Sequence, residues 1–120
     1  MNEDNTTLKK SYLLAVKSVK LGYSIQSSKK EFILSKQFIR SATSTGAMTR
    51  EAQHAESKAD FIHKMSIALK EAKETQYWLD LLKDSEIITE KEWKELHSLL
   101  IENISMLAAI VKSAKATIKK

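Results

Sequence analysis

Two pairs of acid and histidine in the middle of the chain have the spacing of metal ligands. Glu51 and His54 form a Glu-x-x-His pair, and Asp60 and His63 form a looser copy of it. A carboxylate and an imidazole three residues apart share a helix face and can chelate one ion, but a di-metal bundle also needs a lone glutamate from each of the other two helices. Glu102 is the only acid well inside the last helical segment. The ligand set is incomplete, so we expect no bound metal and solvated histidines near one end of the fold.

Other catalytic patterns are missing from the sequence. It has no cysteine and no Gly-x-Ser-x-Gly turn, and Gly22 and Gly46 are its two glycines. Activated serines in nucleophile elbows and phosphate-binding loops both depend on such glycine patterns. We therefore predict a protein without enzymatic activity and without a cofactor.

Positive charge is concentrated in the first half of the chain. The net charge is +5, and residues 1–54, with nine basic and four acidic side chains, carry all of it. At about 100° per helical residue, basic side chains form one ridge near residues 29–50 and a second at the end of the chain. The resulting candidates for binding RNA or DNA are Lys29, Lys36, Arg40, Arg50, Lys112, Lys115 and Lys119. The alternative is a solvated face whose last lysines complement a helix dipole.

A stripe of acids beside an aromatic residue runs along residues 58–84, next to the predicted core face of that segment. Charge-assisted hydrogen bonds from a neighbour's arginine or histidine would suit these acids, and tryptophan is enriched at interfaces. We expect a subunit interface here, and the alternative is an ordinary boundary position at the edge of the bundle. The interface candidates are Asp60, Lys64, Glu71, Glu74 and Trp78.

The elements that must position these residues are helices. The 120 residues include no proline and two glycines, and sustained apolar–polar alternation is absent. Three capping boxes, Ser28 with Glu31, Ser57 with Asp60, and Thr89 with Glu92, predict helix starts. They divide the chain into helices over residues 6–27, 29–54, 58–84 and 90–118. We predict one all-α domain over residues 1–120, an antiparallel up-down-up-down four-helix bundle.

Each predicted helix carries a core stripe at three- and four-residue steps. The first consists of Leu8, Tyr12, Ala15, Val19 and Tyr23, and the second of Leu34, Phe38, Ala42, Thr45 and Ala52. The third consists of Phe61, Met65, Ala68, Ala72, Thr75, Leu79 and Leu82. The fourth consists of Trp93, Leu96, Leu100, Ile104, Leu107, Val111, Ala114 and Ile118. Gly46, within the second stripe region, indicates either a close approach of two backbones or a kink.

The compartment follows from what the chain lacks. Without cysteine it needs no oxidising environment. Its longest apolar run, Met106 to Val111, is far shorter than the roughly 20 residues of a membrane span. We expect a cytoplasmic protein without a membrane segment.

The order of motifs between residues 40 and 79 resembles a known family. The matching residues are Arg40, Ser41, Thr43, Ser44, Gly46, Ala47, Glu51, Ala52, Ser57, Lys58, Asp60 and Phe61, followed by Ala68, Glu71, Glu74, Thr75, Trp78 and Leu79. They resemble the small bacterial four-helix-bundle proteins of 23S rRNA intervening sequences. Thr45, Met48 and Thr49 depart from the family pattern, which has Ile, Asn and Ile there.

This resemblance implies homopentamers of antiparallel bundles. A similar protein is the accessory partner of a reverse transcriptase in diversity-generating retroelements, where a basic surface engages nucleic acid. The resemblance implies no enzymatic activity. Our hypothesis is a non-enzymatic, self-associating bundle, expected to be a pentamer, that binds structured RNA through its basic ridges. The competing hypothesis is a scaffold for protein–protein interaction whose charge is incidental.

Overall fold

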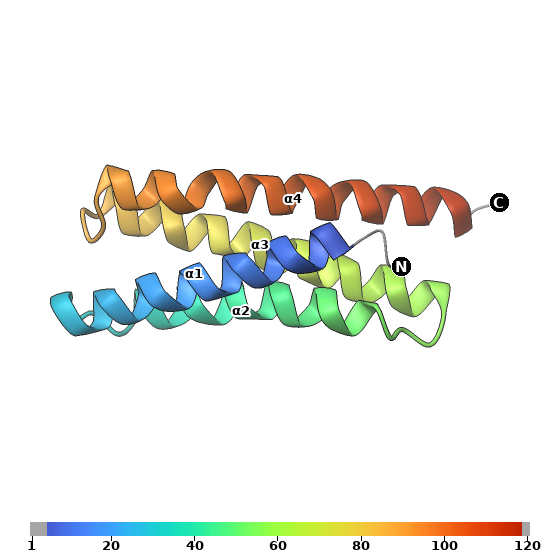
Figure 1. Ribbon diagram of the computed structural model, residues 1–120, viewed down its shortest axis with the longest axis horizontal. Helices are drawn as coiled ribbons and strands as arrows, with labels where there is room; N and C mark the ends of the chain where they lie inside the picture. Colours follow the sequence, from blue (N-terminus) through green and yellow to red (C-terminus); the bar gives the residue numbers. More distant parts are fainter. Residues whose placement is uncertain (1–4, 119–120) are drawn as a thin grey trace.

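The computed structural model describes residues 5–118, which form four antiparallel helices (Figure 1). Their bounds are α1 (Asn5–Lys29), α2 (Leu34–Ala52), α3 (Lys58–Asp84) and α4 (Glu90–Ile118). Successive helices pack side by side, and α1 also meets α4, more loosely, to close a bundle about 51 Å long and 22 Å wide. The predicted all-α, up-down-up-down bundle is confirmed.

Two of the three predicted capping boxes lie at helix starts. Before α4, the Thr89 hydroxyl accepts from the Glu92 amide at 3.1 Å, while the Glu92 carboxylate accepts from the Thr89 amide at 2.9 Å. Before α3, Ser57 accepts from the Asp60 amide at 3.0 Å, but the Asp60 carboxylate accepts from the amide of Glu56 rather than that of Ser57. Both boxes therefore predicted the correct helix start, and the second is formed with a shifted return bond.

The predicted capping box of Ser28 with Glu31 is wrong. The Ser28 hydroxyl donates to the carbonyl of Ser24 inside α1, which continues to Lys29. The chain then turns at Lys30, whose φ of 55° is left-handed, and α2 begins at Leu34. Because Ser28 bonds back into α1, it does not cap α2, and the Glu31 carboxylate does so instead. The link between α1 and α2 is therefore longer than predicted.

Glu31 caps α2 through its side chain. Its carboxylate accepts from the backbone amides of Ile33, Leu34 and Ser35 at 2.7–2.9 Å. These are amides that a helix start leaves without a partner. Burial raises the pKa of the Glu31 carboxyl, but these three hydrogen bonds lower it by more, so the pKa lies below its ordinary value.

We expect Glu31→Gln to lower the free energy of unfolding by about 1 kcal/mol at pH 7, the usual contribution of a helix cap. Because the folded pKa is lowered, the carboxylate stabilises the native state above the unfolded value near 4.5. That contribution is lost as the pH falls through the folded pKa. Urea denaturation followed by circular dichroism should therefore show a gap between the two proteins at pH 7 that closes in acid. Equal stabilities at pH 7 would contradict this role.

The predicted core stripes of α2, α3 and α4 face inward. Phe38, Met65, Leu79, Leu100 and Leu107 are fully buried, and most other members are buried or half-buried. The side chain of Ile118 lies outside the described residues. Several buried polar residues of these helices were not predicted, namely Ser35, Ser41 and Thr49 of α2 and Asn103 of α4. The Asn103 amide donates to the backbone carbonyls of Lys10 and Leu99 and so ties α4 to α1.

The predicted core stripe of α1 is wrong, because this helix is rotated so that its small residues face inward. Its buried residues are Thr7, Ser11, Leu14, Ser18, Gly22 and Ile25. No member of the predicted stripe is fully buried: Leu8, Ala15 and Val19 are half-buried, and Tyr12 and Tyr23 are 57% and 60% exposed. Small inward side chains let α1 approach α2 closely: a Cβ on Gly46 would lie 3.2 Å from the carbonyl oxygen of Ser11. Gly46 therefore serves close backbone approach, one of the two alternatives that the sequence left open.

Candidate functional site

Exposed lysines and apolar side chains gather where α1 ends and α2 begins, on the left in Figure 1. We call this set the basic end; it comprises Lys29, Lys30, Phe32, Ile33 and Lys36. All three lysines are exposed, and none forms an ion pair with another described residue. Phe32 is 55% exposed and Ile33 is 77% exposed.

The backbone under the basic end is held by hydrogen bonds. Besides the three bonds to the Glu31 carboxylate, the Ser35 hydroxyl donates to the Glu31 carbonyl at 2.8 Å. The Gln26 amide of α1 in turn donates to the Ser35 hydroxyl at 3.2 Å, which joins the two helices. The lysines and Phe32 therefore project from a fixed turn.

The sequence predicted Lys29 and Lys36 as candidates but missed Lys30 and Phe32. Both were assigned to a helix beginning at residue 29, on which they do not share the ridge. The adjacency of two lysines to Phe32 and Ile33 was a usable signal. That signal could be interpreted only if residues 30–33 were known to link two helices, and the wrong capping box placed them inside a helix.

Arg40, one turn beyond Lys36, is engaged within the chain. Its guanidinium donates to the Glu71 carboxylate at 3.2 Å and also bonds Glu74. Burial lowers the pKa of Arg40, but its bonds and charge interactions with the two acids raise it by more. The hydrogen bond from the indole N–H of Trp78, at 3.0 Å, is the largest cause of the lowered pKa of Glu74, and Arg40 lowers it further. Arg40 is therefore part of a bridge between α2 and α3 rather than a member of a continuous basic ridge.

The acidic stripe of α3 is thus already paired inside the subunit. Glu71 and Glu74 bond Arg40, and Asp60 forms an ion pair with Lys64 at 3.2 Å. Trp78 is half-buried beside Glu74. A subunit interface at these residues stays a prediction, but the arginine expected from a neighbour is supplied by the chain itself.

The other basic candidates lie away from the basic end. Arg50 stands over the ring of Tyr12, 5.4 Å from its centroid. Lys112 and Lys115 are exposed near the C-terminus of α4, at the opposite end of the bundle in Figure 1. Lys119 lies outside the described residues. The bundle therefore does not unite the predicted basic ridges into one surface.

The histidines singled out for metal binding stand at the α2–α3 end. Glu51, His54 and His63 are all exposed. Within residues 5–118 no three His, Asp or Glu side chains come together as a metal-binding group. The absence of a bound metal in the protein remains a prediction.

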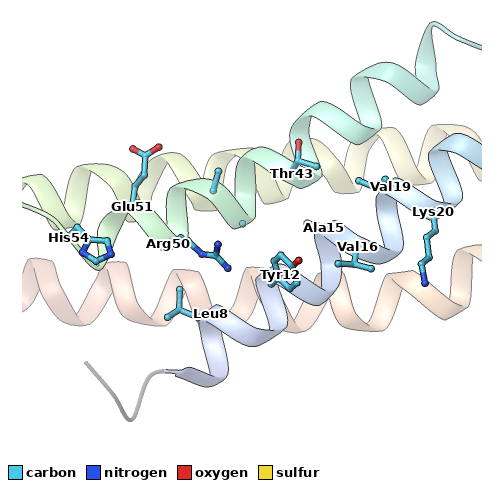
Figure 2. Close-up of a pocket in the computed structure, with 12 residues that line it drawn as sticks. Leu8, Tyr12, Ala15, Val16, Val19, Lys20, Thr43, Arg50, Glu51 and His54 are labelled. Carbon is cyan, nitrogen blue, oxygen red and sulfur yellow. The ribbon is translucent and has the colours of Figure 1, made fainter.

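An apolar groove of about 730 Å³ runs between α1 and α2 (Figure 2). We call it the α1–α2 groove. Leu8, Tyr12, Val16 and Val19 line it from α1, and Gly46 and Ala47 line it from α2. Lys20 and Arg50 also border it. The groove contains most of the apolar stripe that the sequence assigned to the core.

Comparison with known proteins identifies the relatives of this bundle. The family model described as 23S rRNA-intervening sequence protein matches residues 3–109. A crystal structure of a protein with unknown function from the S23 ribosomal protein family of Bacteroides thetaiotaomicron is similar, with 45% sequence identity and a TM-score of 0.86. The similarity covers 88% of this chain and 98% of that one. No curated protein matches.

Proposed function

The chain belongs to the family of 23S rRNA-intervening sequence proteins, and we propose that it is a non-enzymatic, self-associating bundle that binds structured RNA through its basic end. Neither the family nor the similar crystal structure is described as an enzyme. The observation that carries the proposal is the combination, at the junction of α1 and α2, of three exposed lysines with an exposed phenylalanine.

This combination suits RNA that presents unpaired bases. Lysines contact phosphates without reading sequence, and such contacts position a nucleic acid. Proteins recognise RNA loops and bulges by stacking splayed bases on aromatic side chains. Lys29, Lys30 and Lys36 would supply the phosphate contacts, and Phe32 would supply the stacking surface. We therefore propose hairpin loops or bulges as the preferred targets, ahead of duplex DNA.

The competing function is a scaffold that binds another protein, and the α1–α2 groove is the observation that favours it. An apolar groove of this kind typically accepts a helix. The two functions differ in their response to salt, because phosphate binding releases counterions and apolar binding does not. The groove and the basic end share no residue, so RNA binding at the basic end and apolar contacts in the groove do not compete for one surface.

A titration of fluorescently labelled hairpin RNA at low salt tests the proposal. We expect saturable binding at micromolar protein, with weaker binding to a duplex DNA of equal length. Phe32→Ala should reduce the preference for the hairpin while leaving duplex binding almost unchanged, because stacking contributes about 1–3 kcal/mol per base. Ile33→Ala is the matched control, since Ile33 is still more exposed but offers no ring. A hairpin that stays unbound at high micromolar protein would refute RNA binding.

A further inference from the structure

The outward face of α1 is apolar, which is unusual for a helix at the surface of a bundle. Leu8, Tyr12, Val16, Val19 and Tyr23 follow one another at three- and four-residue steps along this face. Apolar patches of this extent on soluble proteins commonly mark interaction sites. Resting on the self-association in the proposed function, we infer that the α1–α2 groove receives helix α4 of a second copy of this chain.

The matching surface is the outward face of α4. By length and composition alone this helix is apolar enough to cross a membrane, yet only 28% of its apolar 18-residue stretch is buried. Its exposed positions include Ser98, Ile101, Ser105, Ala108 and Ala109. Small and apolar side chains make this face a smooth ridge, which a neighbouring molecule can approach closely.

The two surfaces fit in shape. The groove is the concave space between two helices, and Gly46 and Ala47 keep its α2 wall low. The face of α4 is a single convex helix, and a helix laid in an apolar groove is a recurrent recognition mode. Tyr12, with more than half of its surface exposed, is placed to be covered by the incoming helix.

The two surfaces also fit in charge. Lys20 and Arg50 border the groove. Glu95 lies at one edge of the exposed α4 face, on the side away from Ile101, whereas Glu102, two turns on along the same edge, pairs with Lys10 of its own chain. A neighbour's α4 could therefore bury its small residues over Tyr12 while its Glu95 reaches the basic border. Complementary charges of this kind orient a contact more than they strengthen it.

The contact joins different faces of the two copies. In Figure 1 α4 forms the upper edge of the bundle and α2 forms the lower edge. Each copy would offer its groove to one neighbour and its α4 to another. Such a head-to-tail contact closes into a ring at a fixed rotation and otherwise extends into a filament.

Two variants separate the halves of this contact. Val16→Glu places a charge in the groove, and Ala109→Glu places one on the outward face of α4; neither residue is fully buried, and glutamate is a good helix former. By light scattering at tens of micromolar, wild type should have a mass of several chains, and each variant alone should fall to the 13.6 kDa of one chain. An equimolar mixture should recover a dimer of about 27 kDa, twice 13.6 kDa, because the intact groove of one variant meets the intact α4 of the other.

Tyr77→Glu is the matched control on α3. Tyr77 is as exposed as Tyr12 of the groove, at 59% against 57%, but it lies on α3, outside both proposed contact surfaces. This variant should therefore keep the wild-type mass. Circular dichroism checks that all variants remain helical. Dissociation by Tyr77→Glu alone would place the interface on the α3 stripe, and a mixture that stays monomeric would rule out the groove–α4 contact.

Wild type that is monomeric, or that floats with phospholipid vesicles instead of self-associating, would also overturn the inference. The mass measurement contains no RNA and the hairpin titration is read separately. A monomer that binds RNA would therefore refute self-association and leave RNA binding intact. An oligomer unchanged by Val16→Glu and Ala109→Glu would refute only the contact between the groove and α4.

Discussion

Replacing Gly46 by valine should lower the free energy of unfolding by about 2 kcal/mol, because it overpacks a close approach of the α1 and α2 backbones. A Cβ at this position would lie 3.2 Å from the carbonyl oxygen of Ser11, and a backbone atom cannot turn aside as a side-chain end can. The gain in helix propensity over glycine is smaller than this steric cost. For a chain of this size the melting temperature should fall by roughly 8 °C.

Ala59→Val is the control for this prediction. Ala59 is exposed on α3 and does not line the α1–α2 groove, so the added methyl groups meet solvent. Its effect should stay within about 0.5 kcal/mol, as for most surface substitutions. Thermal unfolding of the three proteins by circular dichroism decides the matter. Equal destabilisation by both substitutions would show that steric contact with Ser11 is not the cause.

Reversing the charge of the basic end should have the largest effect on RNA binding. Lys29→Glu combined with Lys36→Glu removes two phosphate contacts and adds two repulsive charges beside the nucleic acid. We expect the affinity for hairpin RNA to fall about 100-fold at low salt, equivalent to about 2.7 kcal/mol. Both side chains are exposed, so the helicity and melting temperature should be nearly unchanged.

Lys70→Glu combined with Lys73→Glu is the control, because both lysines are exposed on α3 and the change in net charge is the same. This pair should weaken binding only a few-fold, through the overall field. Lys112→Glu combined with Lys115→Glu tests the C-terminal end of α4, which lies at the opposite end of the bundle from the basic end. If that pair abolished binding while Lys29→Glu with Lys36→Glu did not, the RNA would lie on the other end of the bundle.

The fold was largely predictable from the sequence where a helix has only one apolar face. In α2, Phe38, Ala42, Thr45 and Ala52 recur at helical spacing among mostly polar residues, so one orientation buries them all. Capping residues also predicted the starts of α3 and α4, because each capping hydrogen bond joins residues three apart in the sequence. Local patterns are sufficient for features that local contacts determine.

The orientation of α1 was not predictable in this way, because the helix has two plausible inward faces. One carries Leu8, Tyr12 and Val19, and the other carries small residues around Leu14 and Ile25. Periodicity favoured the larger apolar residues. Close packing against α2 decided otherwise, since the carbonyl of Ser11 must fit against Gly46. That fit depends on two residues far apart in the sequence.

The same limit explains the candidate site. The sequence placed Arg40 on a basic ridge and Glu71 on an acidic stripe, each correctly assigned to its helix. Their ion pair, 31 residues apart, arises only when α2 packs on α3. Spacing along a helix cannot show which side chains of two helices meet.

The salt dependence of hairpin binding by the wild-type protein tests the central claim, RNA binding through phosphates, most directly. Two to three lysine contacts per engaged chain predict a slope of log affinity against log salt of about −1.8 to −2.7, so affinity should fall roughly 12- to 42-fold between 50 and 200 mM salt. Binding that is unchanged by salt over this range would contradict phosphate recognition and favour a protein-interaction scaffold.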